Sequence, residues 1–310
     1  MLNLIEIERF KGIRRISLQF KGNALVLGEN GSGKTSICEL VRLIQTLGQG
    51  MSVAGVRFAT WGDDLASATR IRIGIKGARE TNFEYMFSVR QMGLTAKVLS
   101  ERLAADGRAV LERDGDRFTY GNGMQRLGET FFPIQSDLLA LSLIRGGSAI
   151  DCFSEFKSAI MSIICLSSGQ PEIERFFSDA RIAQEVGKRL VGWLKKIGSP
   201  IEGLSVRPDN FGNSVLWAHW GWRQLPLELA SHGEKVALLF SIVCSLNEFS
   251  PSTVLWDSPS LGVSEQVSRK MMRYLFDAFR ADGQMIVLSS RGHAVDNLMW
   301  QRVLLQGTGE

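Results

Sequence analysis

The sequence predicts an α/β fold in which a mixed sheet is flanked by helices. Three observations predict it. A glycine-rich loop at 28–33 stands between a strand-like run and a run with helical spacing. Two further apolar runs end at Asp257 and Ser290, and residues 70–120 alternate as antiparallel strands do. With 45% hydrophobic and 22% charged residues, the composition of the 310-residue chain is typical of a globular protein.

The glycine-rich stretch LGENGSGKTS fits the phosphate-binding pattern G-x-x-x-x-G-K-[ST] through Gly28, Gly33, Lys34 and Thr35. Glycines let backbone N–H groups crowd around a phosphate, and the following helix directs its positive N-terminus at the anion. Lys34 is expected to reach the β- and γ-phosphates, and Thr35 to hold Mg²⁺. The predicted ligands of ATP in this P-loop are Asn30, Gly31, Ser32, Gly33, Lys34, Thr35 and Ser36.

Upstream of the loop, the residues at 4–20 alternate as two short strands. This start, with Phe10, Lys11 and Gly12 in the turn and GENGSGKTS after the second strand, resembles the SMC, RecF and OLD-type ATPases of the ABC class. The resemblance implies an ABC-type ATPase head. Because residues of that turn contact the nucleotide in those proteins, Phe10 and Lys11 become candidates for such contacts. A plain surface hairpin is the alternative for each.

A second element of the resemblance is the segment LPLELASHGEKVALLFSIVCSL, in which Ser231, His232, Gly233 and Glu234 form a small turn before an apolar helix. In ABC-class ATPases such a signature turn contacts the nucleotide of the opposing subunit. The resemblance therefore implies contacts from Ser231, Gly233 and Glu234, and a head-to-tail homodimer around ATP. An ordinary helix N-cap would have the same residues.

The stretch VLWDSPSLG, residues 254–262, resembles the Walker B strand of these ATPases. Asp257 would bind the water shell of Mg²⁺, and the residues at 261–264 occupy the position of the dimer-crossing D-loop. Ser258 stands where the family has a catalytic glutamate. A serine is no useful general base at neutral pH, so tight ATP binding with slow or absent hydrolysis is expected.

Two further positions are expected on the same site. The strand QMIVLSS at 284–290 resembles the one that ends in a switch histidine, but the aligned residue is Arg291, and His293 follows two residues later. Either Arg291 or His293 would contact the γ-phosphate, or neither does. Gln135 is the candidate Q-loop ligand of Mg²⁺, with an ordinary surface glutamine as the alternative.

The sequence is divided into an N-terminal ATPase lobe at 1–135, a helical insert at 136–205 and a C-terminal ATPase lobe at 206–310. The segment with helical periodicity, 150–198, is too short for a long coiled coil, and it suggests a surface for a partner.

In the run WAHWGW at 217–222, a strand would place Ala218, Trp220 and Trp222 on one face. These tryptophans belong either to a core or interface or to a platform for nucleic-acid bases.

Composition narrows the remaining choices. A net charge of +4 permits contact with nucleic acid but does not argue for it. Four dispersed cysteines and three histidines suggest no zinc site. The apolar runs are too short to span a membrane, so a cytoplasmic protein is expected.

The favoured function is an ATP-gated switch or scaffold that controls an effector, a nuclease or toxin, in anti-phage defence. A RecF-like DNA-repair or DNA-remodelling ATPase is the main rival, and a metabolic kinase lacks a visible acceptor site.

Overall fold

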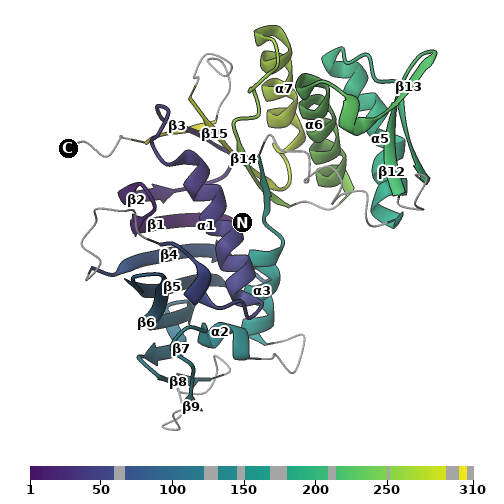
Figure 1. The fold of residues 1–310 in the computed structure, drawn as a ribbon. Helices are drawn as coiled ribbons and strands as arrows, with labels where there is room; N and C mark the ends of the chain where they lie inside the picture. Colours follow the sequence, from purple (N-terminus) through teal and green to yellow (C-terminus); the bar gives the residue numbers. More distant parts are fainter. Residues whose placement is uncertain are drawn as a thin grey trace. The chain divides into compact units, whose positions relative to one another are not determined.

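The computed structural model describes the following residues: 1–58, 67–121, 132–144, 151–167, 180–208, 214–249, 252–290 and 300–305. The chain forms two compact units, one of residues 1–22, 28–164 and 303–310, the other of residues 23–27 and 165–302. The units cut across the three segments predicted from the sequence, because the strand at 24–27 belongs to the second unit and the boundary at 164/165 falls inside the predicted insert. Figure 1 shows the elements of each unit.

The first unit is built on an antiparallel sheet with the strand order β2-β1-β4-β5-β6-β7-β8-β9. Its strands are β1 (Leu2–Phe10), β2 (Ile13–Gln19), β4 (Thr69–Lys76), β5 (Asn82–Met92), β6 (Thr95–Ala105), β7 (Arg108–Asp114), β8 (Arg117–Tyr120) and β9 (Phe132–Pro133). The predicted strands before the P-loop and across 70–120 are confirmed. Within 70–120, β7 is the strand without an alternating pattern of its own, because its two buried apolar residues, Val110 and Leu111, are adjacent.

Helices pack on one face of this sheet (Figure 1). They are α1 (Lys34–Gly48), α2 (Ala140–Leu143) and α3 (Cys152–Met161), with a 3-10 turn, η1 (Val53–Gly55), after α1. α1 buries Ile37, Val41 and Ile44, which lie three and four residues apart on one side of the helix. Phe156 of α3 packs against Tyr85 with ring centroids 5.3 Å apart. In the described part of this unit, no helix covers the opposite, open face.

The second unit contains a five-stranded sheet with the order β10-β14-β15-β3-β16. Its strands are β3 (Ala24–Leu27), β10 (Ile164–Leu166), β14 (Thr253–Asp257), β15 (Gln284–Ser289) and β16 (Gln301–Leu304). β14, β15 and β3 run parallel, and all residues of β14 and β15 are buried. β10 corrects the all-helical prediction for 150–198. Its short apolar run continues the helix-like pattern of α3, but the run pairs with β14 instead.

Three helices and a small sheet complete the second unit. The helices are α5 (Ala180–Ile197), α6 (His232–Phe249) and α7 (Glu265–Ala278), and the antiparallel sheet consists of β11 (Gly203–Pro208), β12 (Ser214–Trp220) and β13 (Arg223–Pro226), followed by a 3-10 turn, η2 (Leu227–Leu229). None of the helices in the described ranges has the length and apolar character needed to span a membrane. The prediction that Trp222 shares a strand face with Ala218 and Trp220 is wrong, because β12 ends at Trp220 and Trp222 lies in the turn that follows.

Candidate nucleotide-binding site

The P-loop connects β3 to α1 through a backbone that requires glycine at several positions. Gly31 and Gly33 have φ angles of 84° and 93°, a region in which a Cβ is strained. A Cβ on Gly28 would lie 2.4 Å from Ser32 Oγ and 2.9 Å from Leu305 Cβ. The loop is therefore closed so tightly that a side chain at Gly28 would displace its neighbours.

Lys34 folds over this loop. Its ammonium donates hydrogen bonds to the carbonyl oxygens of Gly28 at 2.7 Å and Glu29 at 2.6 Å, and to Ser32 Oγ at 3.3 Å. Gly33 caps α1 without any side-chain hydrogen bond, so the first N–H groups of α1 face the loop, where an anion is favoured. These features fit a nucleotide phosphate, which would lie between the Lys34 ammonium and the helix N-terminus.

The tight closure gives a first prediction. Gly28→Ala should weaken ATP binding about 5- to 150-fold, because overpacking by a methyl group costs about 1–3 kcal/mol. Isothermal titration of the variant with ATP measures the change. Gly22→Ala is the matched control, since a Cβ there meets nothing within 4 Å. Equal ATP affinity in the native protein and Gly28→Ala would contradict the fit of phosphate to this loop.

The hairpin turn between β1 and β2 lies beside the P-loop helix. A Cβ on Gly33 would come within 2.6 Å of Ile13 Cγ1 at the start of β2. Lys11 forms an ion pair with Glu39 of α1, with Nζ and Oε2 2.6 Å apart. Phe10 is 1% exposed and packs edge-on against Phe58. The structure therefore places Lys11 near the loop, where its nucleotide contact stays a prediction, but it gives Phe10 a position in the core and no surface for a nucleotide.

Asp257 lies at the carboxyl edge of the parallel strands. In the register, Asp257 is opposite Leu288, and Ser289 is opposite Leu27, the last residue of β3 before the P-loop. Since β15 separates β14 from β3, Asp257 is two strands from Leu27, about 10 Å along the sheet edge. The structure thus brings the end of the predicted Walker B strand to the sheet edge from which the P-loop departs.

The side chain of Ser258 points toward Asp257. Its hydroxyl donates to Asp257 Oδ1 at 2.9 Å, and its N–H donates to the Leu288 carbonyl at 2.8 Å. Ser258 has a φ of 54°, a left-handed conformation that is uncommon for any residue with a Cβ. Ser258 can orient the carboxylate of Asp257, but its neutral hydroxyl offers no base for an attacking water.

The signature turn forms a complete capping box at the start of α6. Ser231 N donates to Glu234 Oε2 at 2.7 Å, and Glu234 N donates to Ser231 Oγ at 3.3 Å. A Cβ on Gly233 would lie 3.1 Å from the Gly262 carbonyl oxygen, so the turn packs directly on the predicted D-loop. The sequence predicted each of these segments, but not their direct contact.

The remaining predicted residues lie elsewhere. The Val53 N–H donates to the Asp137 carbonyl at 2.8 Å, which ties the segment around Gln135 to the residues that follow the C-terminal end of α1, whereas Thr35 is at its N-terminal end. A 15-residue helix is about 22 Å long, so the structure does not bring Gln135 to Thr35. Arg291 and His293 lie outside the described residues. Among the described residues, no group of three or more His, Cys, Asp or Glu could hold a metal ion.

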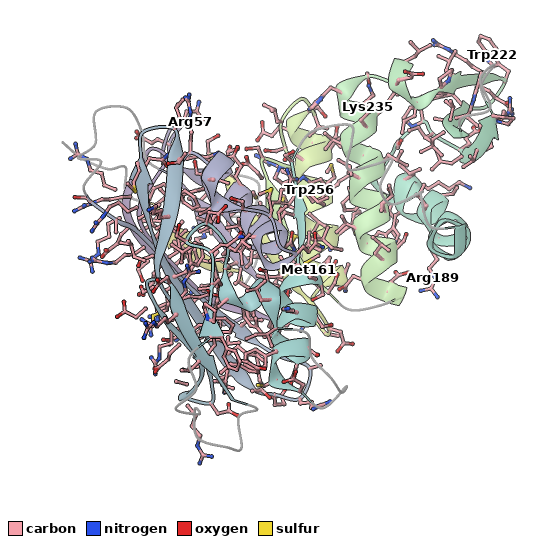
Figure 2. All side chains as sticks on the ribbon, turned by 60° about the horizontal axis from the view of Figure 1, so that its bottom comes forward. Arg57, Met161, Arg189, Trp222, Lys235 and Trp256 are labelled. Carbon is pink, nitrogen blue, oxygen red and sulfur yellow. The ribbon has the colours of Figure 1, made fainter. Side chains whose placement is uncertain are left out.

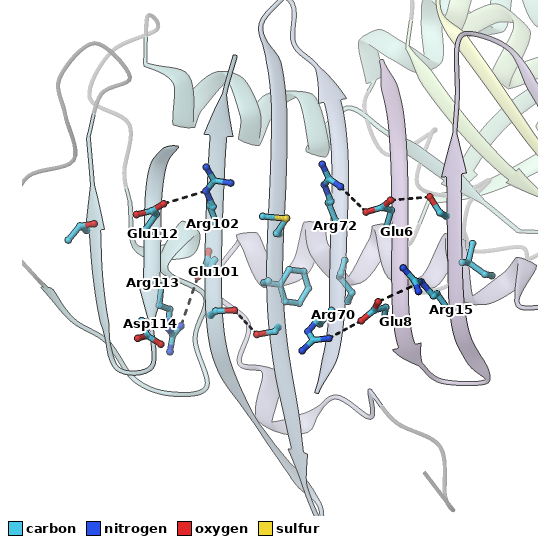
Figure 3. A pocket seen from close by; sticks show the side chains of 18 of the residues that line it. Glu6, Glu8, Arg15, Arg70, Arg72, Glu101, Arg102, Glu112, Arg113 and Asp114 are labelled. Carbon is cyan, nitrogen blue, oxygen red and sulfur yellow. Dashed lines mark hydrogen bonds and ion pairs between the residues drawn. The ribbon is translucent and has the colours of Figure 1, made fainter. Parts of the chain in front are cut away.

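A cavity of about 1320 Å³ lies on the sheet face of the first unit that is opposite α1, α2 and α3, and it is not this site (Figure 3). Its lining includes six arginines and five carboxylates. Cross-strand ion pairs neutralise most of them: Arg70 and Glu8 are 3.1 Å apart, and Arg102 and Glu112 are 3.4 Å apart. A face with charges balanced in this way does not resemble a surface for the phosphate backbone of nucleic acid.

Comparison with known proteins bears on the fold. Residues 1–50 match the family described as "Protein of unknown function (DUF2813)". No match was found among curated proteins. Among solved structures, an SMC head bound to the C-winged helix domain of ScpA is similar with a TM-score of 0.57 and 14% identity, covering 94% of this chain and 90% of the other. This chain has the fold of an SMC head domain.

A second SMC head, with an extended coiled coil and bound to the C-terminal domain of ScpA derived from Pyrococcus furiosus, has a TM-score of 0.53 and 11% identity, covering 94% of this chain and 89% of the other. The SMC-head fold confirms the predicted α/β class, with its mixed sheet flanked by helices and its antiparallel β region. At these identities the similarity concerns the fold.

Proposed function

We propose that this protein is an ATP-binding head of the ABC class that dimerises head to tail around ATP and hydrolyses it slowly or not at all. The observation that carries the proposal is the P-loop, where the Lys34 ammonium lies against the loop carbonyls and α1 begins at Gly33 without a side-chain cap. Thr35 and Asp257 would share Mg²⁺ with the phosphates. When bound, ATP with Mg²⁺ supplies a polyanion that two subunits can hold together.

The second contact in each composite site would come from the partner's signature turn. The Ser231 Oγ accepts one hydrogen bond from Glu234 N, so its own proton can be donated to a phosphate oxygen. The N-terminus of α6 adds its dipole at the same place. Lys34 of one subunit and Ser231 of the other would then hold the same ATP.

Slow hydrolysis makes such a dimer a switch that ATP holds closed. Mass action favours the state that binds nucleotide, without any turnover. We propose that this state holds or releases an effector protein, a nuclease or toxin, in bacterial anti-phage defence. The resemblance to OLD-type ATPases supports the defence role, and the two SMC heads bound to ScpA support a partner protein for a head of this fold.

The alternative is a RecF-like ATPase that binds DNA. It predicts duplex binding that weakens steeply with salt and ATP hydrolysis that DNA stimulates. The balanced charges on the open sheet face do not favour it. Titration of the protein with a fluorescent duplex at two salt concentrations separates the two functions.

A mixing experiment tests the composite site. Lys34→Ala should abolish ATP-dependent dimerisation, and Ser231→Ala should weaken it about 10- to 100-fold, since hydrogen bonds to charged groups contribute about 1.5–3 kcal/mol. An equimolar mixture of the two variants should recover dimers, because one of its two sites pairs an intact Lys34 with an intact Ser231. Analytical ultracentrifugation with and without ATP measures the association.

Loss of the N-cap alone must be separated from loss of the nucleotide contact. Asp151→Ala removes the side-chain cap of α3 and serves as the matched control, with native dimerisation expected. If the native protein stays monomeric with saturating ATP, or if the mixture behaves as the average of its two components, the head-to-tail proposal is wrong.

A further inference from the structure

The signature turn has a third support besides its own capping box. The Trp220 indole Nε1 donates a hydrogen bond of 2.8 Å to Glu234 Oε1. The other oxygen of the same carboxylate, Oε2, accepts from Ser231 N. Glu234 therefore connects Trp220 directly to the backbone of Ser231, through one rigid carboxylate.

Trp220 is itself held in place by the small sheet of the second unit. It is the last residue of β12, where it pairs with Arg223 of β13. The next residue, Gly221, adopts a φ of 56°, and its N–H donates to Glu202 Oε2 at 3.0 Å. Because the strand and the turn fix its backbone, the Trp220 side chain can act as a fixed donor toward Glu234.

The opposite side of the signature turn is closed by the segment after Pro259. A Cβ on Gly262 would lie 2.2 Å from His232 Cδ2, and Gly262 has a φ of 77°. The turn is thus confined between the Gly262 backbone on one side and the Trp220–Glu234 hydrogen bond on the other. Of these two supports, only the hydrogen bond can be removed without a steric clash.

We propose that Trp220 is a positioning residue for the signature turn, and that the β11–β13 sheet is thereby part of the nucleotide-sensing machinery. Trp220 would not touch ATP. It would fix the Glu234 carboxylate, which in turn orients Ser231 for the γ-phosphate bound by the opposing subunit. This inference rests on the proposed function for the identity of the ligand, but the positioning itself belongs to the isolated subunit.

Trp220→Phe removes the N–H donor and keeps an aromatic ring. Trp222→Phe is the matched control, because Trp222 lies two residues away, is 94% exposed and projects from the end of the hairpin (Figure 2). In the native protein without nucleotide, hydrogen exchange should be slow at the amides of Ser231 and Glu234. Exchange there should quicken about 3- to 10-fold in Trp220→Phe and stay unchanged in Trp222→Phe.

The second readout is the ATP-dependent dimer. Trp220→Phe should leave the ATP affinity of the monomer's own P-loop unchanged and weaken dimerisation about 3- to 10-fold. In a Glu234→Ala background the same substitution should have no further effect on dimerisation, which a general loss of stability would not reproduce.

The outcomes separate the two proposals. Native exchange at the signature amides in Trp220→Phe overturns the positioning role, whether or not the protein dimerises. A native protein that stays monomeric with ATP overturns the proposed function, while the exchange rates still decide whether Trp220 positions the turn. Equal dimerisation of native protein and Trp220→Phe, with faster exchange in the variant, overturns the transmission from Glu234 to the nucleotide.

Discussion

Ser258→Glu should raise the steady-state rate of ATP hydrolysis roughly 10²–10⁴-fold over the native protein, because it supplies the general base that the site lacks. The new carboxylate would follow Asp257 at the carboxyl edge of the parallel strands, where an attacking water could be polarised. The backbone should accept the change, since Ser258 already carries a Cβ at its φ of 54°. A coupled phosphate-release assay measures the rate, with Lys34→Ala as the blank.

Ser258→Gln is the control for this gain. Glutamine has the same shape as glutamate but no basic oxygen at neutral pH, so its rate should stay at the native level. An equal gain in both variants would assign the effect to loss of the hydrogen bond from Ser258 to Asp257. Brisk hydrolysis by the native protein would falsify the assignment of Ser258 as a disabled position.

Local sequence patterns predicted those parts of the fold and site whose chemistry is contiguous in the chain. The P-loop is one such part, because its glycines, Lys34 and the helix start follow one another directly. The signature turn is another, since Ser231 and Glu234 have the spacing of a capping box. The strand carrying Asp257 was predicted because Val254, Leu255 and Trp256 form an apolar run that ends in a carboxylate.

Features that depend on long-range packing could not be predicted in this way. Phe10 is buried because Phe58, far along the chain, covers it. Gln135 lies near the far end of α1 because its neighbours bond to Val53 and Val98, contacts that no local pattern encodes. Trp220 reaches Glu234 only because β12 and β13 fold back toward α6. The sequence offers one signal for the contact between Trp220 and Glu234: a tryptophan stands at the end of a strand that a short segment connects to the signature turn.

A buried polar network in the first unit shows the same dependence on distant residues. Glu101 accepts hydrogen bonds from the Tyr85 hydroxyl at 2.8 Å and from the N–H groups of Ala140 and Leu141 at 2.6 and 2.9 Å. Arg113 lies 4.0 Å from it, and both charged side chains have no exposed surface (Figure 3). Glu101 thus connects the sheet to the start of α2, and its removal would leave several buried donors unsatisfied.

Glu101→Ala should lower the free energy of unfolding by about 3–5 kcal/mol, the cost of breaking one side of a buried ion pair. Urea denaturation measures the loss. Glu112→Ala is the matched control on the adjacent strand: its pair with Arg102 is half exposed, so a loss of about 0–1 kcal/mol is expected. Similar losses in the two variants would show that the Glu101 network does not stabilise the unit beyond an ordinary surface pair.

The pH dependence of this loss provides a second check. Burial raises the pKa of Glu101 above its ordinary value, even though its hydrogen bonds oppose that shift. The folded protein therefore binds this proton more tightly than the unfolded chain does. The contribution of Glu101 to stability is complete below the unfolded pKa and declines as the pH rises through the folded pKa. The difference in unfolding free energy between the native protein and Glu101→Ala should therefore be largest at acidic pH and narrow as the pH rises, while the difference for Glu112→Ala should stay small throughout. If the difference in unfolding free energy between the native protein and Glu101→Ala instead widens as the pH rises, the folded protein favours the ionised carboxylate, which accepts three hydrogen bonds.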